Sequence, residues 1–276
     1  MKQRAKKTPP PARAGYARVQ RWVAWAGVFL LVASFIWFEF LPRGERLPGR
    51  DSRPLAVDGP IRRVVIDAGH GGQDSGAIRN GILEKELTLD VAKRLERLVR
   101  AKGLTTVLTR SGDETVSLAS RAEIANGQSD SVFVSIHFDE GGRAAATGVQ
   151  TFYAARQAAP ARGISSWLPF LQQVSSAAAS NVESQSLAGF IQEALVARTR
   201  AFNRGTTAQQ FYVVANVYHP AVLVEGGFLS NPEDIHKITT EEYRQQLAVA
   251  ITEGIMRYRE LATERKPTLA VAEPTT

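Results

Sequence analysis

Short apolar runs alternate along the chain with segments in which apolar side chains recur every three or four positions. The recurring pattern predicts amphipathic helices over 84–102, 117–126, 184–200 and 240–259. The short runs predict strands, because such runs suit strands that are buried on both faces of a sheet. We expect strands at 61–69, 104–110, 131–137, 148–153, 210–214 and 221–227. This alternation predicts an α/β fold built on a mainly parallel sheet.

The longest apolar run lies close to the amino terminus. Residues 22–41 carry a single charge, Glu39, and have tryptophans toward both ends, as a transmembrane helix does. Residues 1–21 carry seven basic and no acidic side chains, which predicts that they stay in the cytoplasm. The alternative is a cleaved signal peptide with small residues at Ala33 and Ser34. Because the run stays apolar beyond them, an uncleaved anchor is favoured.

Composition divides the rest of the chain. Residues 42–60 are rich in proline, glycine and charge and predict a linker, residues 61–262 a single globular domain, and residues 263–276 a disordered tail. We therefore expect a single-pass protein of the cell membrane, with a basic cytoplasmic head at 1–21 and a transmembrane signal anchor at 22–41. Its folded domain is expected on the periplasmic or extracellular side.

Charge and cysteine content narrow the possible partners and metals. The net charge of +7 resides in the first 21 residues, so the remainder is neutral overall and no nucleic-acid partner is expected. The chain has no cysteine, so a transition metal must be held by His, Asp or Glu.

Three such residues stand at the ends of predicted strands. His70 follows "VVIDAG", His137 follows "SVFVSI", and Glu225 follows "AVLV". Ligands of open α/β sheets bind beyond the carboxyl ends of the strands, so these side chains are expected at one edge. A phosphate-binding loop does not fit, because a G-x-G-x-x-G motif that starts at Gly69 would need a glycine where Asp74 stands. A serine or cysteine triad does not fit either, because the chain has no G-x-S-x-G motif and no cysteine. A metal site remains.

Glu84 opens the long predicted helix and has two readings. It is either a third metal ligand or an acid that favours the positive end of the helix dipole. Two histidines and a glutamate would form a three-ligand zinc set with an open position for water. Bound zinc lowers the pKa of such a water to about 7 and polarises a carbonyl. Glu225 would then be the general base.

Four sequence blocks resemble the zinc-dependent N-acetylmuramoyl-L-alanine amidases, the amidase-3 family. They are "VVIDAGHGGQDSGAIRNGILEKELTLDVAKRL", "VLTRSGDETVSLASRAEIAN", "DSVFVSIHFD" and "PAVLVEGGFLSNPED". The resemblance implies a twisted six-stranded sheet flanked by helices. It also implies Zn²⁺ held by His70, Glu84 and His137, with Glu225 as the catalytic carboxylate. The reaction would be cleavage of the amide bond between N-acetylmuramic acid and L-alanine in peptidoglycan.

Other polar residues are expected in supporting places. Asp67 and Asp74 can orient the histidine loop or simply form turns. Three residues in the family blocks should brace the fold: Arg110, Arg121 and Asn126. The glycines around His70 should let the chain turn and leave room for a bulky substrate. We expect His219 and His236 to lie outside the site.

Residues 154–183 read as an insertion. Its apolar positions fit a short helix packed on the surface of the domain. The resemblance implies an alternative, because some members of the family carry a helix here that covers the zinc until an activator protein removes it. Two other functions remain open: a zinc peptidase that cuts within the stem peptide, and a non-catalytic envelope-binding protein that keeps the fold.

Overall fold

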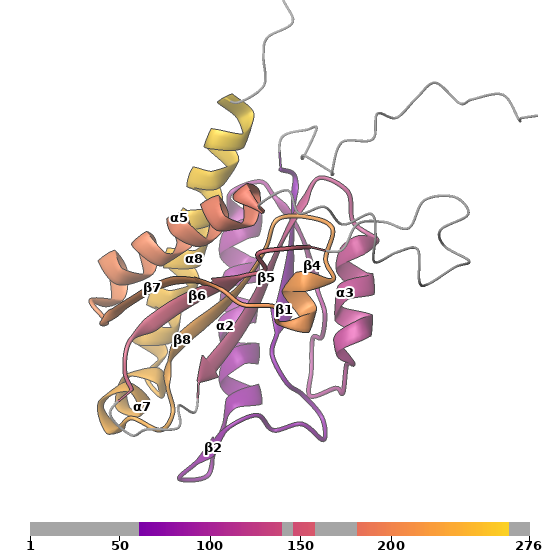
Figure 1. Ribbon diagram of the computed structural model, residues 1–276. Helices are drawn as coiled ribbons and strands as arrows, with labels where there is room; N and C mark the ends of the chain where they lie inside the picture. Colours follow the sequence, from indigo (N-terminus) through magenta and orange to yellow (C-terminus); the bar gives the residue numbers. More distant parts are fainter. Residues whose placement is uncertain (1–60, 140–145, 158–180, 265–276) are drawn as a thin grey trace, which may run out of the picture. The chain divides into compact units, whose positions relative to one another are not determined.

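A six-stranded sheet forms the centre of the domain (Figure 1). The structure is a computed structural model and describes residues 61–139, 146–157 and 181–264. The strands lie in the order β4 (Thr105–Leu108), β1 (Arg63–Ala68), β5 (Ser131–Asp139), β8 (Ala221–Phe228), β6 (Val149–Tyr153) and β7 (Asn203–Ala208). All neighbours run parallel except β6 and β8, so the sheet is mainly parallel, as expected.

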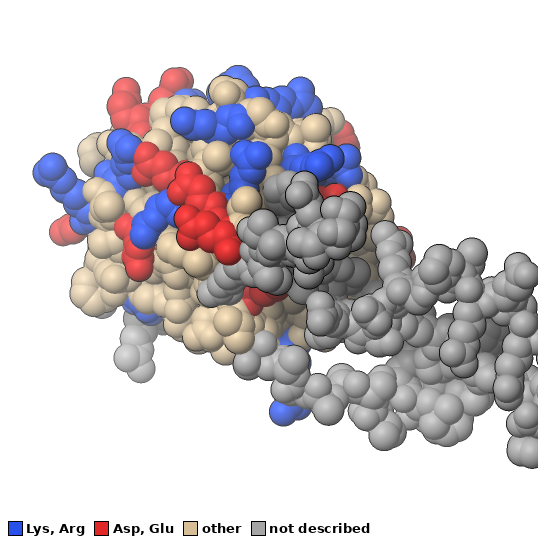
Figure 2. All heavy atoms as spheres, turned by 90° about the horizontal axis from the view of Figure 1, so that it is seen from above, with Lys and Arg blue, Asp and Glu red and all other residues tan. Residues whose placement is uncertain are grey.

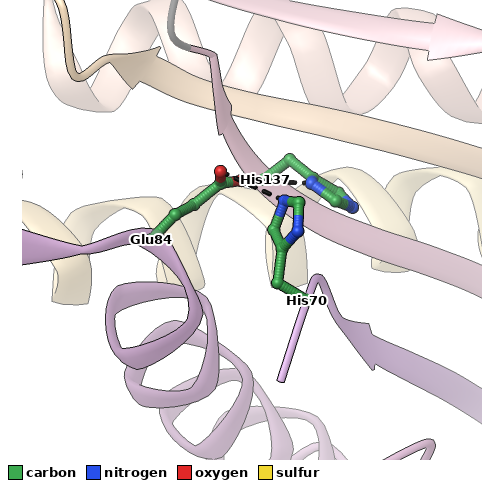
Figure 3. A group of neighbouring side chains, drawn as sticks. All are labelled: His70, Glu84 and His137. Atoms are coloured by element: carbon green, nitrogen blue, oxygen red, sulfur yellow. Dashed lines mark hydrogen bonds and ion pairs between the residues drawn. The ribbon is translucent and has the colours of Figure 1, made fainter. Parts of the chain in front are cut away.

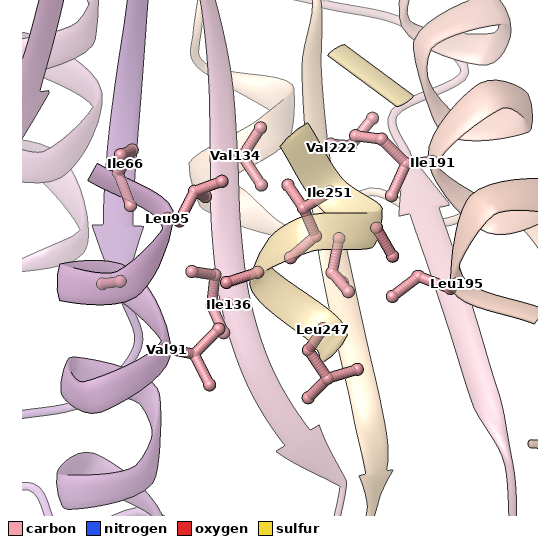
Figure 4. Packing of buried hydrophobic residues seen from close by; sticks show 14 of the residues in the cluster. Ile66, Val91, Leu95, Val134, Ile136, Ile191, Leu195, Val222, Leu247 and Ile251 are labelled. Carbon is pink, nitrogen blue, oxygen red and sulfur yellow. The ribbon is translucent and has the colours of Figure 1, made fainter. Parts of the chain in front are cut away.

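Helices cover both faces of this sheet, which explains its continuous apolar strands. Val64 and Ile66 of β1 belong to the larger core, under α2 (Glu84–Ala101), α5 (Val182–Thr199) and α8 (Glu241–Glu264). Figure 4 shows part of this core between α2, α8 and the central strands. Val65 points the other way and packs with residues of α3 (Leu118–Asn126) and α6 (Tyr212–Ala215). Alternate residues of one strand thus serve two cores.

The sixth strand is not where the sequence placed it. The predicted strand at 210–214 is wrong, because Tyr212–Ala215 form the short helix α6. The sheet instead takes Asn203–Ala208 as its edge strand β7, a polar segment that contains a glycine. An edge strand has only one neighbour and here is largely exposed, so it needs no apolar run. The last helix also extends to Glu264, beyond the predicted end at 259.

Two small elements lie close to the carboxyl edge of the sheet. The hairpin of β2 (Ile78–Arg79) and β3 (Ile82–Leu83) leads directly into α2, and α7 (Pro232–Ile238) follows β8. Figure 1 shows both at the end of the domain toward which the central strands point. They therefore flank the edge at which the sequence predicts a site.

Several predictions concern segments outside the described residues. The anchor at 22–41, the linker, most of the insertion at 154–183 and most of the tail belong to this group. In the described part of the chain, no helix combines the length and apolar character that crossing a bilayer requires. Figure 2, which views the domain from above, shows basic and acidic side chains on the same face.

Candidate metal centre

The loop after β1 holds His70 in an unusual backbone conformation. His70 has φ of 60°, in the left-handed region, and Gly71 and Gly72 also have positive φ. Reciprocal backbone hydrogen bonds between Gly71 and Asp74 close the turn. Positive φ is rare for a non-glycine residue and is retained where surrounding contacts enforce it. The loop is therefore fixed by its surroundings.

Two buried arginines hold the backbone of this loop in place. The Arg110 guanidinium donates to the carbonyl oxygens of Ala68 and Gly69 at 2.9 and 2.8 Å. Arg121 donates to Ala68 O and His70 O, both at 2.7 Å, and pairs with the buried Asp67 carboxylate at 2.6 Å. The expected bracing roles of both arginines are confirmed, and Asp67 acts through Arg121.

Asp74 orients the His70 ring. Its Oδ2 lies 2.8 Å from His70 Nδ1, and its Oδ1 accepts from the Gly76 backbone N–H at 3.0 Å. Because an ionised carboxylate only accepts, Nδ1 carries the proton, and Nε2 of the neutral ring is left with a free lone pair. Nε2 points to Glu84, 3.1 Å from its Oε2. Both interpretations of Asp74 are confirmed, because its carboxylate contacts the His70 ring and also closes a turn with Gly76.

Glu84 uses both carboxylate oxygens. Its Oε2 accepts from the Ala77 backbone N–H at 2.9 Å, and its Oε1 accepts from the Phe138 backbone N–H at 3.0 Å. Oε1 also lies 3.1 Å from His137 Nδ1 (Figure 3). Glu84 is 3% exposed and is the first residue of α2, so it can also favour the helix dipole. The two readings of Glu84 are thus compatible.

The three side chains converge from three elements. His70 comes from the loop after β1, Glu84 from the start of α2 and His137 from β5, and one donor atom of each lies within 4.8 Å of the other two. Ligands about 2.1 Å from a tetrahedral zinc lie roughly 3.4 Å apart, so the 3.1 Å contacts are already close to that spacing. Two imidazoles and one carboxylate are a donor set that suits zinc.

Electrostatics in this cluster favour ionised partners. Burial opposes a charge on Glu84, but the hydrogen bonds and charges of His137 and His70 outweigh it and hold the pKa of Glu84 well below its usual range. Burial likewise opposes a charge on His70, while Glu84 and Asp74 raise its pKa overall. Both shifts favour an ionised Glu84 carboxylate beside the His70 ring.

Two of the loop glycines make room for this cluster itself. A Cβ on Gly69 would lie 2.4 Å from His137 Cε1, and a Cβ on Gly76 would lie 2.5 Å from Glu84 Oε2. Neither distance is possible for a real side chain. We expected these glycines to free space for substrate; the structure shows that both leave space for proposed ligands.

Glu225 lies on β8 beside His137 of β5. The two residues are direct partners in the parallel pairing, so their side chains leave the sheet on the same face. Glu225 Oε2 is buried and has no hydrogen-bond partner among the described residues. Burial, together with the charges of Glu84 and Asp139, raises the pKa of Glu225 well above its ordinary value. A raised pKa is common for carboxyls that move protons in catalysis.

The remaining candidates lie elsewhere, as expected. Buried His219 has a lowered pKa because burial disfavours its charge, and exposed His236 lies on α7. Asn126 bridges the backbone of Asn216 and Tyr218. All three therefore serve positions outside the His70–Glu84–His137 cluster.

Sequence reasoning missed one contact that fixes the loop. Lys85 Nζ donates to Gly72 O at 2.9 Å and pairs with Asp113 at 2.7 Å, while Asp113 Oδ1 accepts from the Gly72 backbone N–H. Asp113 is 28 positions from Lys85, so no local pattern indicates this contact.

Known proteins match both the sequence and the fold. The family model described as N-acetylmuramoyl-L-alanine amidase matches residues 64–257. The amidase AmiA of Escherichia coli is 33% identical over 230 residues, which cover 75% of this chain and 80% of AmiA. An N-acetylmuramoyl-L-alanine amidase from Clostridium difficile superposes with a TM-score of 0.60 at 32% identity, over 73% of this chain and 98% of that one.

A further solved structure contains a second protein. It is the CwlD amidase of Clostridioides difficile in complex with the GerS lipoprotein, with a TM-score of 0.62, 27% identity and coverage of 72% of this chain and 99% of that chain. Since the family model spans more than half of the sequence and agrees with the fold, this chain belongs to the amidase-3 family of N-acetylmuramoyl-L-alanine amidases.

Proposed function

We propose that this chain hydrolyses the amide bond between N-acetylmuramic acid and the L-alanine of the peptidoglycan stem peptide. The observation that carries this function is the convergence of His70, Glu84 and His137 at the edge of a sheet that matches the amidase family. Membership in this family supports metal dependence, and the donor set favours zinc.

His70 Nε2, the Glu84 carboxylate and His137 Nδ1 would hold the ion. A bound zinc ion supplies a water of lowered pKa and an electrophile for the scissile carbonyl. The protein's part is to keep His70 Nδ1 protonated through Asp74, so that Nε2 is free to bind. Glu84 stays ionised because two backbone N–H groups and two imidazoles surround it.

Glu225 is our candidate for moving the proton. Its carboxylate would accept the proton of the attacking water and pass it to the leaving nitrogen of L-alanine, so the free peptide amine leaves neutral. The raised pKa of Glu225 and the unpartnered Oε2 support this role, because a base needs both affinity for a proton and a free lone pair.

Digestion of purified peptidoglycan tests the reaction. We expect the full chain loaded with zinc to release stem peptides with a free L-alanine amino group and to leave the glycan strands intact. A chelator should stop release, and added zinc should restore it. Peptides cut internally would instead favour the zinc peptidase, and no release at all would favour the envelope-binding protein.

We also propose that residues 22–41 anchor the chain in the cell membrane and place the domain outside the cytoplasm. The apolar length and the basic head at 1–21 support this proposal. The intact chain should then fractionate with membranes. A shortened soluble form as the only product would refute the anchor and favour a cleaved signal peptide.

An activator protein that acts on the insertion at 154–183 is a further proposal. The CwlD structure, in which an amidase is bound to a lipoprotein, supports the idea that such domains take protein partners. Deletion of 160–180 tests the lid. Faster hydrolysis by the purified chain would support it, whereas loss of folding would favour a helix packed on the domain.

A further inference from the structure

A cavity of about 330 Å³ lies between the β2–β3 hairpin and the segment around α7. Ligand pockets span about 300–1,000 Å³, so this one suits a short segment of a ligand. The hairpin leads directly into Glu84, and the other wall begins at Leu229, four residues after Glu225. The cavity therefore adjoins the segments that carry the proposed metal ligand and the proposed base.

The walls combine apolar surface with cationic and polar groups. Apolar contacts come from Ile82, Leu229, Pro232 and Ile235. Arg79 and His236 also line the cavity, whereas no Asp, Glu, Phe, Tyr or Trp of the described segments does. Sugar rings usually pack against aromatic faces, so this lining suits a peptide better than a glycan. The guanidinium of Arg79 in this lining suits a carboxylate.

The Arg79 side chain is available to bind such a group. The hairpin turn has φ of 51° at Asn80 and 77° at Gly81, as in a type I′ turn, and Arg79 pairs with Ile82 across it. The Arg79 side chain is exposed and makes no hydrogen bond or ion pair with the other described residues. Most other basic side chains around the site are occupied; Arg110, Arg121 and Lys85 all brace the histidine loop.

The Ser230 hydroxyl lacks a hydrogen-bond partner in the described part of the chain. Its Oγ is buried and unpaired among the described residues, and Ser230 lines the same cavity. A buried hydroxyl without a hydrogen bond is unfavourable. Because this oxygen has almost no accessible surface, a polar guest would bond with it only after the Ser230 side chain turns toward the cavity.

We propose that this cavity is a subsite for a carboxylate-bearing part of the stem peptide, with Arg79 as the residue that recognises the carboxylate. The inference rests on the proposed amidase function and adds substrate selection to it. Peptidoglycan stem peptides that differ by amidation of their carboxylates would then be cleaved at different rates.

Matched substrates test this selection. We would compare two N-acetylmuramoyl tripeptides of L-Ala, D-Glu and L-Lys, one with free and one with amidated carboxylates, using the full chain loaded with zinc. The wild type should show a kcat/KM about tenfold higher on the free form, as expected for one charge-assisted hydrogen bond. Arg79→Gln should remove this preference by slowing the free form only, and Arg79→Lys should restore part of it.

Arg97→Gln is the matched control. Arg97 is also exposed and lies thirteen residues after Glu84 along α2, roughly 20 Å from the site, so its loss should leave both rates unchanged. Equal rates on the two substrates in the wild type would overturn the proposal, as would an equal loss on both in Arg79→Gln.

A binding measurement separates this proposal from the amidase function. If the wild type cleaves neither substrate, the reaction is refuted, and calorimetry with the free tripeptide and its amide then decides on the subsite. Preference of the wild type for the free carboxylate, lost in Arg79→Gln, would support the subsite even then. Equal or undetectable binding of both peptides would overturn it.

Discussion

Gly69→Ala is expected to disable the metal centre through a single methyl group. A Cβ at this position would lie 2.4, 2.5 and 2.7 Å from three atoms of the His137 ring. The backbone cannot easily yield, because the Gly69 N–H donates to Ile136 O at 3.0 Å and Gly69 O accepts from Arg110 and Thr88 at 2.8 Å. The imidazole must therefore move.

The required movement is large compared with the tolerance of a metal site. Ordinary contact with a Cβ begins at 3.4 Å, so the ring has to shift by about 1 Å. Metal–ligand distances are held to about 0.2 Å. Zinc affinity should fall by about 10–100-fold or more, because mutation of residues that only support the metal ligands already causes a loss of that size. The overpacked metal-free domain should also lose about 1–3 kcal/mol of unfolding free energy.

A competition titration of the full chain against a chromophoric chelator measures the affinity, and urea unfolding measures the stability. Gly189→Ala is the control, since Gly189 lies inside α5 with nothing within 4 Å of an added Cβ. It should leave zinc binding unchanged and stabilise the helix by up to about 1 kcal/mol. Zinc affinity of Gly69→Ala equal to that of the wild type would refute the proposed role of His137.

Three other substitutions address the base, the orienting acid and the buried arginine. Glu225→Gln should lower kcat by about 10²–10⁴-fold while zinc binding persists, and a kcat within tenfold of the wild type would exclude Glu225 as the base. The pKa of Glu225 is raised in the folded metal-free chain. Ionisation of its carboxyl therefore lowers the free energy of unfolding as pH rises above the unfolded pKa of 4.5. In urea unfolding, the metal-free Glu225→Gln variant should thus have a higher free energy of unfolding than the wild type at pH 7 but not at pH 4. Asp74→Asn should weaken zinc binding by about 10–100-fold in the same chelator competition, and an unchanged affinity would mean that the Asp74–His70 contact does not orient the ligand. Arg121→Met strands the buried Asp67 charge and should cost about 3–5 kcal/mol in urea unfolding; a loss below 1 kcal/mol would contradict this.

The strands that carry the proposed ligands were predictable because they are buried on both faces. In such strands a polar residue interrupts a continuous apolar run, so His137 and Glu225 are conspicuous in the sequence. The parallel sheet then sets them side by side as register partners. By contrast, the polar edge strand β7 resembles a loop in sequence, and the apolar single turn α6 resembles a short buried strand.

The sequence also could not indicate how the histidine loop is fixed. Arg121 lies 53 positions from Ala68, whose carbonyl it binds, and Lys85 lies 28 positions from Asp113. Such contacts depend on how helices settle on the sheet, which no local periodicity encodes. The resemblance to a family identified the arginines as important without indicating their partners.

These long-range contacts explain why the loop can keep a strained histidine. A left-handed residue costs roughly 1–2 kcal/mol, and the carbonyls on either side of it are held by two buried guanidinium groups. Glu84 meanwhile receives backbone N–H groups from two separate segments, at Ala77 and Phe138. The His70 loop and Glu84 are therefore held by contacts with the folded backbone and with buried arginines. It follows that removal of zinc should stop catalysis while leaving the fold of the domain in place.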